Sequence, residues 1–153
     1  MSFQQNSVSS QTLSSQALKC GSGVPYTPIS QHYKIHFGKK VYKLPITTAT
    51  TCPNREGLRG MKTCNFCDVW GSAAYPDLQK KSVTEQIAQA KSRVLQRVHA
   101  PAFLAYFQAY TTTFSRVQEL QNHITEALCG EDICGVVVGT RPDCLSDALF
   151  DFF

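Results

Sequence analysis

The stretch that decides the fold of this chain is Cys52-Pro-Asn-Arg-Glu-Gly-Leu-Arg-Gly-Met-Lys-Thr-Cys64-Asn-Phe-Cys67. Its cysteines follow the spacing C-x11-C-x2-C, so Cys64 and Cys67 can chelate one metal centre from a tight turn. Cys52 can reach the same centre because the connecting loop is polar and contains Gly57 and Gly60. Four ligands are usual for structural zinc and for a [4Fe–4S] cluster, whereas three thiolates on such a cluster leave one iron open.

The spacing alone does not choose between zinc and an iron–sulfur cluster. A zinc ion would need a fourth ligand, for which Cys144, His32 and His36 are the candidates. The two centres differ in chemistry, because a cluster can transfer one electron and zinc cannot.

Composition and charge narrow the class of protein. The 153 residues are enough for one domain with a modest core. A net charge of +4, from Lys and Arg that are scattered along the chain, favours a solvated surface over a phosphate-binding patch. The seven cysteines are an odd number, the first residues show no secretory leader, and no apolar run approaches a membrane span. We therefore expect a soluble, cytoplasmic protein that has no membrane partner and uses its thiols as ligands or core residues.

The first residues differ in composition from the rest of the chain. Residues 1–30 are rich in Ser and Gln and almost uncharged, which predicts a disordered tail. The remaining residues, 31–153, are expected to form one domain. Its first strand is predicted at Val41-Tyr-Lys-Leu-Pro-Ile46, where Pro45 ends the strand or places it at a sheet edge. The cysteine loop then hangs from the carboxyl end of that strand.

Two helices are predicted from capping boxes followed by apolar residues at helical spacing. The first begins at Ser82-Val-Thr-Glu85, runs for about sixteen residues and stops at His99-Ala-Pro101. The second begins at Ser115-Arg-Val-Gln118 and ends at Gly130. A third helix is expected after Asp143 or Ser146, either of which could cap it.

Two further strands are predicted from nearly continuous apolar runs, Phe103 to Tyr110 and Ile133 to Gly139, which suit strands buried on both faces. Strands that alternate with helices in this way predict an α/β fold with a parallel sheet. Right-handed crossovers place the carboxyl ends of parallel strands at one edge, where ligands bind in such folds. The cysteine loop and residues 108–113 and 140–143 should therefore converge there.

Polar side chains follow the second and third strands at this edge. The amide and hydroxyls of Gln108, Tyr110, Thr111 and Thr113 could hydrogen-bond a ligand, or could be ordinary strand-end polarity. The guanidinium of Arg141 suits a carboxylate or phosphate, and Asp143 suits a ribose hydroxyl or an ammonium group. The alternative is an Arg–Asp pair that braces the turn at Pro142.

Five motifs in this order resemble the YhcC-type radical SAM proteins, which are related to the radical SAM domain of the Elongator catalytic subunit. The matching residues are Lys40-Val-Tyr-Lys-Leu-Pro, Thr51-Cys-Pro-Asn-Arg-Glu-Gly, Cys64-Asn-Phe-Cys67, Tyr106-Phe-Gln-Ala-Tyr-Thr and Gly139-Thr-Arg-Pro-Asp-Cys-Leu. The resemblance covers the chain from about residue 32 to its end, and it favours the cluster over zinc.

The resemblance implies an enzyme that uses two cofactors. Cys52, Cys64 and Cys67 would hold three irons of a [4Fe–4S] cluster, and the fourth iron would bind S-adenosylmethionine. An electron donor of the flavodoxin or ferredoxin type would reduce the cluster, and cleavage of the sulfonium would give a 5′-deoxyadenosyl radical for an unknown substrate, with RNA as one candidate. Phe66 would stack near the adenine, and Gln108, Tyr110, Thr111, Thr113, Arg141 and Asp143 would contact the cofactor.

Two features depart from the family pattern. Thr112 stands where the family usually has Asn. Members of the family are about twice as long, so residues 31–153 would form the first half of a partial TIM barrel. We therefore expect a truncated chain that associates through the unpaired edge of its third strand and through Phe150, Phe152 and Phe153. The alternative function is a non-catalytic remnant that binds zinc or an iron–sulfur cluster.

Overall fold

The computed structural model describes residues 25–99 and 102–153. Most of the predicted tail, and the end of the predicted helix stop at Ala100 and Pro101, lie outside the described residues. None of the helices in the described ranges has the length and hydropathy that a membrane crossing requires.

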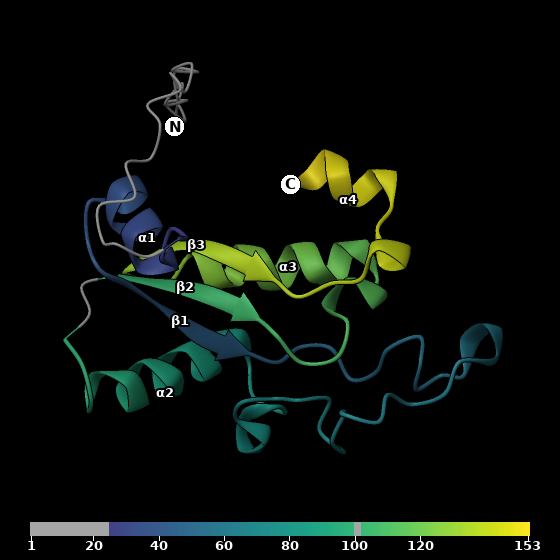
Figure 1. Cartoon of the computed structure of the whole chain (residues 1–153). Coiled ribbons are helices and arrows are strands. Elements are labelled where there is room, and N and C mark those ends of the chain that lie inside the picture. Colours follow the sequence, from purple (N-terminus) through teal and green to yellow (C-terminus); the bar gives the residue numbers. More distant parts are fainter. Residues whose placement is uncertain (1–24, 100–101) are drawn as a thin grey trace, which may run out of the picture.

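The described residues form a mixed α/β fold around a small, open, parallel sheet (Figure 1). Its strands are β1 (Val41–Ile46), β2 (Ala102–Phe107) and β3 (Ile133–Val138), and they lie side by side in the order β1-β2-β3. The predicted alternation of strands and helices is thus confirmed. All three strands point the same way, so the loops that follow them leave from one edge of the sheet.

Two amphipathic helices, α2 (Val83–Leu95) and α3 (Val117–Leu128), pack on one face of the sheet and form the main core with it. A third helix, α4 (Asp147–Phe152), adds Leu149 to that core. The largest fully buried side chains of this core are Leu44, Ile46, Phe103, Phe107, Leu120 and Leu149. This core leaves the carboxyl edge of the sheet accessible to the loops.

The other face of the sheet is covered at the beginning of its strands by α1 (Ile29–Phe37). We did not predict this helix, which begins at Ile29, next to the expected end of the tail. Tyr33 and Phe37 lie one helical turn apart and pack against Val41 and Leu104. Gly38, with a φ of 67°, ends the helix in the left-handed region. In Figure 1, α1 and α2 lie on opposite sides of the sheet.

The two predicted capping boxes have different outcomes. Ser82 caps α2 as predicted, because its side chain accepts from the backbone N–H of Glu85 and the Glu85 carboxylate accepts from that of Ser82. This helix has 13 residues and ends at Leu95, before the predicted stop. The second capping box is wrong, since α3 starts after Arg116 and has no side-chain cap. The Ser115 hydroxyl donates instead to the carbonyl oxygen of Thr112, at 2.9 Å.

The third strand is less buried than its apolar sequence predicts. Every residue of β3 is half-buried, because β3 lies at the edge of the sheet and no other described strand pairs with its outer side. Phe150 and Phe153 are 65% and 62% exposed. Phe152 was expected to take part in association as an exposed side chain. This expectation is wrong, since Phe152 is half-buried and packs against the main core.

Candidate metal centre at the carboxyl edge of the sheet

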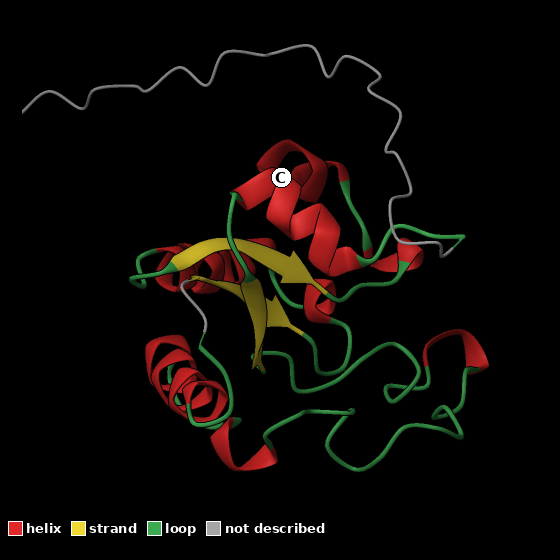
Figure 2. Ribbon diagram, turned by 60° about the vertical axis from the view of Figure 1, so that its left-hand side comes forward, coloured by secondary structure: helices red, strands yellow, loops and turns green. Residues whose placement is uncertain are grey.

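The loops that follow the three strands meet at the carboxyl edge, as the topology predicts. Figures 1 and 2 show the long loop between β1 and α2 projecting beyond that edge. The backbone N–H of Tyr110 donates to the carbonyl of Gly71 at 3.0 Å, and that of Thr112 donates to Gly139 at 3.2 Å. Residues after β2 thus connect the cysteine loop on one side to the loop after β3 on the other.

The start of the cysteine loop is fastened to α2 by Gln86, which is 2% exposed. The Gln86 Oε1 accepts from the backbone N–H of Thr47 at 2.8 Å, and its Nε2 donates to the Thr47 carbonyl at 2.9 Å. The same Nε2 also donates to the carbonyl of Lys81 at 3.0 Å. One buried amide therefore holds the first residue after β1 and a residue just before α2.

The three cysteines lie at different depths in this loop. Cys52 is buried, whereas Cys64 and Cys67 are half-buried. The backbone N–H of Cys67 donates to the carbonyl of Cys64 at 3.0 Å, which is the tight turn expected from the C-x2-C spacing. A pair on one turn can supply two ligands to one metal centre.

The sulfurs of Cys64 and Cys67 accept hydrogen bonds from the two residues that follow Cys52-Pro53. The Asn54 Nδ2 donates to Cys64 Sγ at 3.3 Å, and the Arg55 Nη2 donates to Cys67 Sγ at 3.4 Å. Our sequence reasoning quoted Asn54 and Arg55 within a motif but gave them no role. Their position immediately after Cys52-Pro53 is the signal that could have indicated one.

The side chain of Arg55 clamps the end of the cysteine loop. It donates to the carbonyl oxygens of Asp68 and Val69, and its guanidinium lies 5.1 Å from the centroid of the Tyr110 ring. The hydrogen bond to Cys67 and the nearby thiols raise the pKa of Arg55 above its ordinary value. Its buried Nε has no hydrogen-bond partner among the described residues.

Residues after β2 support the same segment. The Tyr110 hydroxyl donates to the Val69 carbonyl at 3.2 Å, and the Gln108 Nε2 donates to the Ser72 carbonyl at 2.9 Å. Gly71, with a φ of 64°, lies against the Tyr110 ring. Gln108 and Tyr110 therefore lie at the predicted edge, and both hold the cysteine loop.

Arg141 and Asp143 form the ion pair that was the alternative to ligand contact, and Arg141 also reaches the cysteine loop. Its Nε and Nη2 donate to the two carboxylate oxygens of Asp143 at 2.9 and 2.8 Å. The guanidinium lowers the pKa of Asp143, and the carboxylate raises that of Arg141. The Nη1 of Arg141 donates to Asn54 Oδ1, and its Nη2 lies 3.6 Å from the sulfur of Met61.

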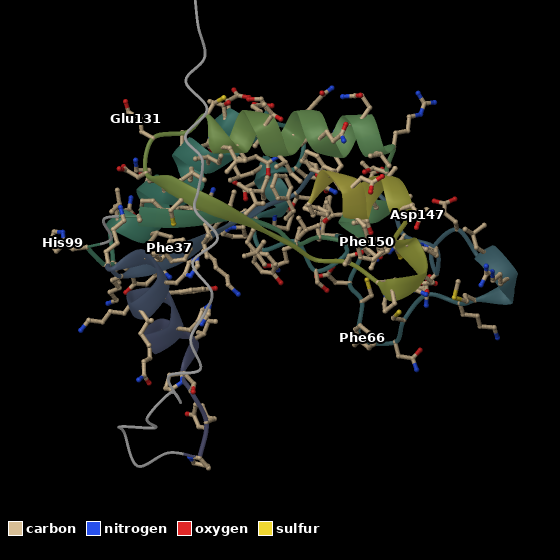
Figure 3. The ribbon with its side chains drawn as sticks, turned by 90° about the horizontal axis from the view of Figure 1, so that it is seen from above. Phe37, Phe66, His99, Glu131, Asp147 and Phe150 are labelled. Atoms are coloured by element: carbon tan, nitrogen blue, oxygen red, sulfur yellow. The ribbon has the colours of Figure 1, made fainter. Side chains whose placement is uncertain are left out.

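The remaining candidate residues are spread over the edge. Thr111 is buried, and the hydroxyl of the buried Thr113 is hydrogen-bonded to that of Thr140. Phe66 is 88% exposed, and Figure 3 shows it at the margin of the molecule, well separated from α3. Thr112, at the position where an Asn was expected, is buried and donates its hydroxyl to the Phe107 carbonyl at 3.3 Å.

The candidate fourth ligands for zinc lie at opposite ends of the sheet. His32 and His36 are on α1, which precedes β1, so they lie away from the cysteine loop. Cys144 is half-buried in the loop after β3 and shares a cleft of about 140 Å³ with Pro53 and Met61. That volume is below the 300–1,000 Å³ of typical small-molecule sites.

The three cysteines are suitable metal ligands by their chemistry, but their side chains are too far apart to hold a metal in this arrangement. Among the described residues, no three His, Cys, Asp or Glu side chains are close enough together to hold a metal ion. The donor set nonetheless suits an iron–sulfur cluster, since it offers three thiols in one loop, two of them accepting N–H···S bonds. Binding would require the loop to draw its cysteines together, as metal binding commonly orders its own site.

Comparison with known proteins finds longer relatives. The chain is 44% identical to protein YhcC of Escherichia coli (strain K12) over 115 residues, which are 75% of this chain and 36% of YhcC. It is 32% identical over 127 residues to the uncharacterized protein YtqA of Bacillus subtilis (strain 168), covering 83% of this chain and 39% of YtqA. Over 126 residues it is 25% identical to the uncharacterized protein MJ0486 of Methanocaldococcus jannaschii.

The chain therefore spans little more than a third of the curated relatives that it matches. No protein-family model matches the chain, and no solved structure does. The names of these relatives state no activity.

Proposed function

We propose that this chain carries the cluster-binding part of a radical SAM enzyme, with Cys52, Cys64 and Cys67 as ligands of a [4Fe–4S] cluster. The observation that carries the proposal is the loop after β1, in which hydrogen-bond donors from Asn54 and Arg55 reach two of the three cysteine sulfurs. Hydrogen bonds to sulfur are among the means by which proteins adjust the potential of such clusters.

When bound, the cluster would supply the electron that cleaves the sulfonium of S-adenosylmethionine. The exposed ring of Phe66 could cover the adenine of that cofactor. Gln108, Tyr110, Thr111 and Thr113 lie at the same edge and keep acceptor capacity on their side-chain oxygens, which suits an ammonium group or ribose hydroxyls. Arg141 and Asp143 are less suited to direct contact, because they are engaged with each other.

The three-stranded sheet would be the first half of a partial TIM barrel, and the greater length of the relatives is compatible with that assignment. A complete protein would need the remaining strands to enclose the cofactor and to position a substrate, for which RNA is one candidate. An electron donor of the flavodoxin or ferredoxin type and a cytoplasmic location belong to the same proposal.

Anaerobic reconstitution of the chain with iron and sulfide tests the proposal. We expect broad brown absorbance with bound iron and sulfide, which Cys64→Ala and Cys67→Ala should abolish. Cys129→Ala is the matched control, because Cys129 is exposed at the end of α3. A 5′-deoxyadenosine assay with a reductant then measures cofactor cleavage. Stoichiometric zinc that iron does not replace, with no sulfide, would refute the cluster.

The second candidate is a non-catalytic zinc site, and the position of Cys144 favours it. Cys144 shares a cleft with Pro53, the neighbour of Cys52. A fourth thiolate would complete a closed structural site. Under this alternative Cys144→Ala would release zinc, whereas under the cluster proposal it would leave the iron content unchanged.

A further inference from the structure

We infer that Arg141 and Asp143 act as positioning residues for the cysteine loop, by fixing the Asn54 amide in the orientation that donates to Cys64. The structure connects the four side chains in the order Asp143, Arg141, Asn54, Cys64. This inference rests on the proposed function for its consequence in a cluster, but its geometry belongs to the chain itself.

The two ends of the Asn54 amide have opposite hydrogen-bonding roles. Its Nδ2 donates to Cys64 Sγ at 3.3 Å and to the Lys62 carbonyl at 3.1 Å, whereas its Oδ1 accepts from Arg141. A guanidinium can donate and cannot accept. It therefore stabilises the amide with the oxygen toward Arg141, and the nitrogen must then face the sulfur. The reverse orientation would place two donors together and an oxygen against Cys64.

The Arg141 guanidinium is itself held in place. Two parallel hydrogen bonds join it to Asp143, and a bidentate pair of this kind fixes the plane of the guanidinium fork. The side chains of Arg141 and Asp143 are 31% and 40% exposed, so they lie near solvent yet retain the geometry of the pair. The fork leaves Nη1 to point at Asn54.

A second, separate contact serves Cys67. Arg55 donates to Cys67 Sγ, and the supports of Arg55 are Tyr110 and the carbonyl groups of Asp68 and Val69 rather than Arg141. Each of the two paired cysteines thus has its own donor with its own support. This separation makes the inference testable, because a substitution at Arg141 should change the reactivity of the Cys64 thiol and leave that of Cys67 unchanged.

The experiment compares the chemical environments of the two thiols in the metal-free, reduced chain of 153 residues. Iodoacetamide alkylation of Cys64 and Cys67 is followed by mass spectrometry for Asn54→Leu, Arg141→Leu, Asp143→Asn and the double variant Asn54→Leu/Arg141→Leu. Arg97→Leu is the control, because Arg97 is exposed after the end of α2. We expect the ratio of the Cys64 rate to the Cys67 rate to change at least threefold in the first three variants and to stay constant in the control.

The double variant distinguishes an indirect effect from general loosening. If Arg141 acts through Asn54, the double variant should change the ratio no more than Asn54→Leu does alone. Additive effects, an equal change at both cysteines, or a constant ratio in Arg141→Leu would each overturn the inference. Circular dichroism of every variant tests whether the fold is retained. If Arg141→Leu has lost the fold, Arg141→Lys takes its place, because Lys keeps the positive charge but not the planar guanidinium.

Reconstitution of the iron–sulfur cluster provides an independent test. Loss of the N–H···S bond should make the midpoint potential of the cluster more negative in Asn54→Leu and Arg141→Leu, and metal affinity should fall about 10- to 100-fold. A wild-type chain that forms no cluster would refute the proposed function, while the alkylation ratios would still decide the positioning role. An unchanged potential in Arg141→Leu, with a formed cluster, would overturn the positioning role alone.

Discussion

Replacing Gln86 with Leu removes the buried amide that fastens the cysteine loop to α2. Leu has nearly the same volume, so the change tests hydrogen bonding more than packing. In the wild-type chain the backbone N–H and carbonyl of Thr47 are both satisfied by Gln86, and Thr47 is 5% exposed. The variant leaves these two backbone groups buried without their partner.

The size of the effect follows from those two groups. Each unsatisfied buried backbone group costs about 1–3 kcal/mol. The Lys81 carbonyl contributes less, because Lys81 is exposed and water can replace the lost donor. Burying an apolar side chain in place of an amide offsets about 1–2 kcal/mol. From the middle of each range, we expect Gln86→Leu to lower the free energy of unfolding by about 2.5 kcal/mol, which corresponds to a fall in Tm of about 5–10 °C for a chain of this size.

Urea denaturation followed by far-UV circular dichroism measures this loss. Gln118→Leu is the control, because Gln118 is exposed on α3 and its amide bonds only to the exposed Asn122 among the described residues. That pair contributes about 0.2–0.5 kcal/mol. If Gln86→Leu cost no more than the control, the Thr47 groups would not depend on Gln86, and the account of how the loop is anchored would be refuted.

Three further predictions concern the loop, the response to acid and association. Gly71→Ala should displace the loop after Cys67 and speed its cleavage in limited proteolysis, because the added Cβ would meet the Tyr110 ring at 2.4 Å; unchanged cleavage would contradict this. Arg93 lowers the pKa of Asp77 below the ordinary 3.8, so their contribution to stability is present above that pH and is lost as the pH falls through the lowered value. Asp77→Asn should therefore reduce the loss of stability as the pH falls from neutral to below the ordinary pKa of 3.8, measured by urea midpoints, and an equal loss would argue against the pair. The chain should associate through the β3 edge and nearby exposed aromatic side chains, and Phe150→Lys should reduce the mass measured by light scattering after size exclusion; a monomeric wild type would refute this.

The parts of the fold that sequence predicts well are those with local causes. The capping box at Ser82 and Glu85 depends on four consecutive residues, and the structure forms it as predicted. The same pattern at Ser115 fails because a short 3-10 turn, Thr112–Phe114, ends there and uses the Ser115 hydroxyl on its own carbonyl. The helix α1 was missed because none of its residues is fully buried and its apolar contacts are with β1 and β2 rather than within the helix.

For the candidate site, the position was predictable from the sequence and the side-chain contacts were not. Parallel topology was enough to predict that the three loops meet, since chain direction decides where strands end. The partners of Asn54 and Arg55 could not be predicted, because they depend on how a long, irregular loop folds back on itself. Burial of β3 was overestimated because an apolar run indicates a strand but does not say whether that strand lies at a sheet edge.

The hydrogen bond between Asn54 and Arg141 joins residues 87 positions apart, and this separation has a consequence during synthesis. At about 5–20 residues per second, a ribosome adds Arg141 roughly 4–17 s after Asn54. During that interval the cysteine loop has been synthesised, whereas Arg141, which holds Asn54, has not. Until Arg141 is added, Asn54 lacks the partner that orients its amide toward Cys64, whereas the residues that support Cys67 are already present. The orientation of the Asn54 amide can therefore be fixed only after the third strand and the loop that follows it have been synthesised.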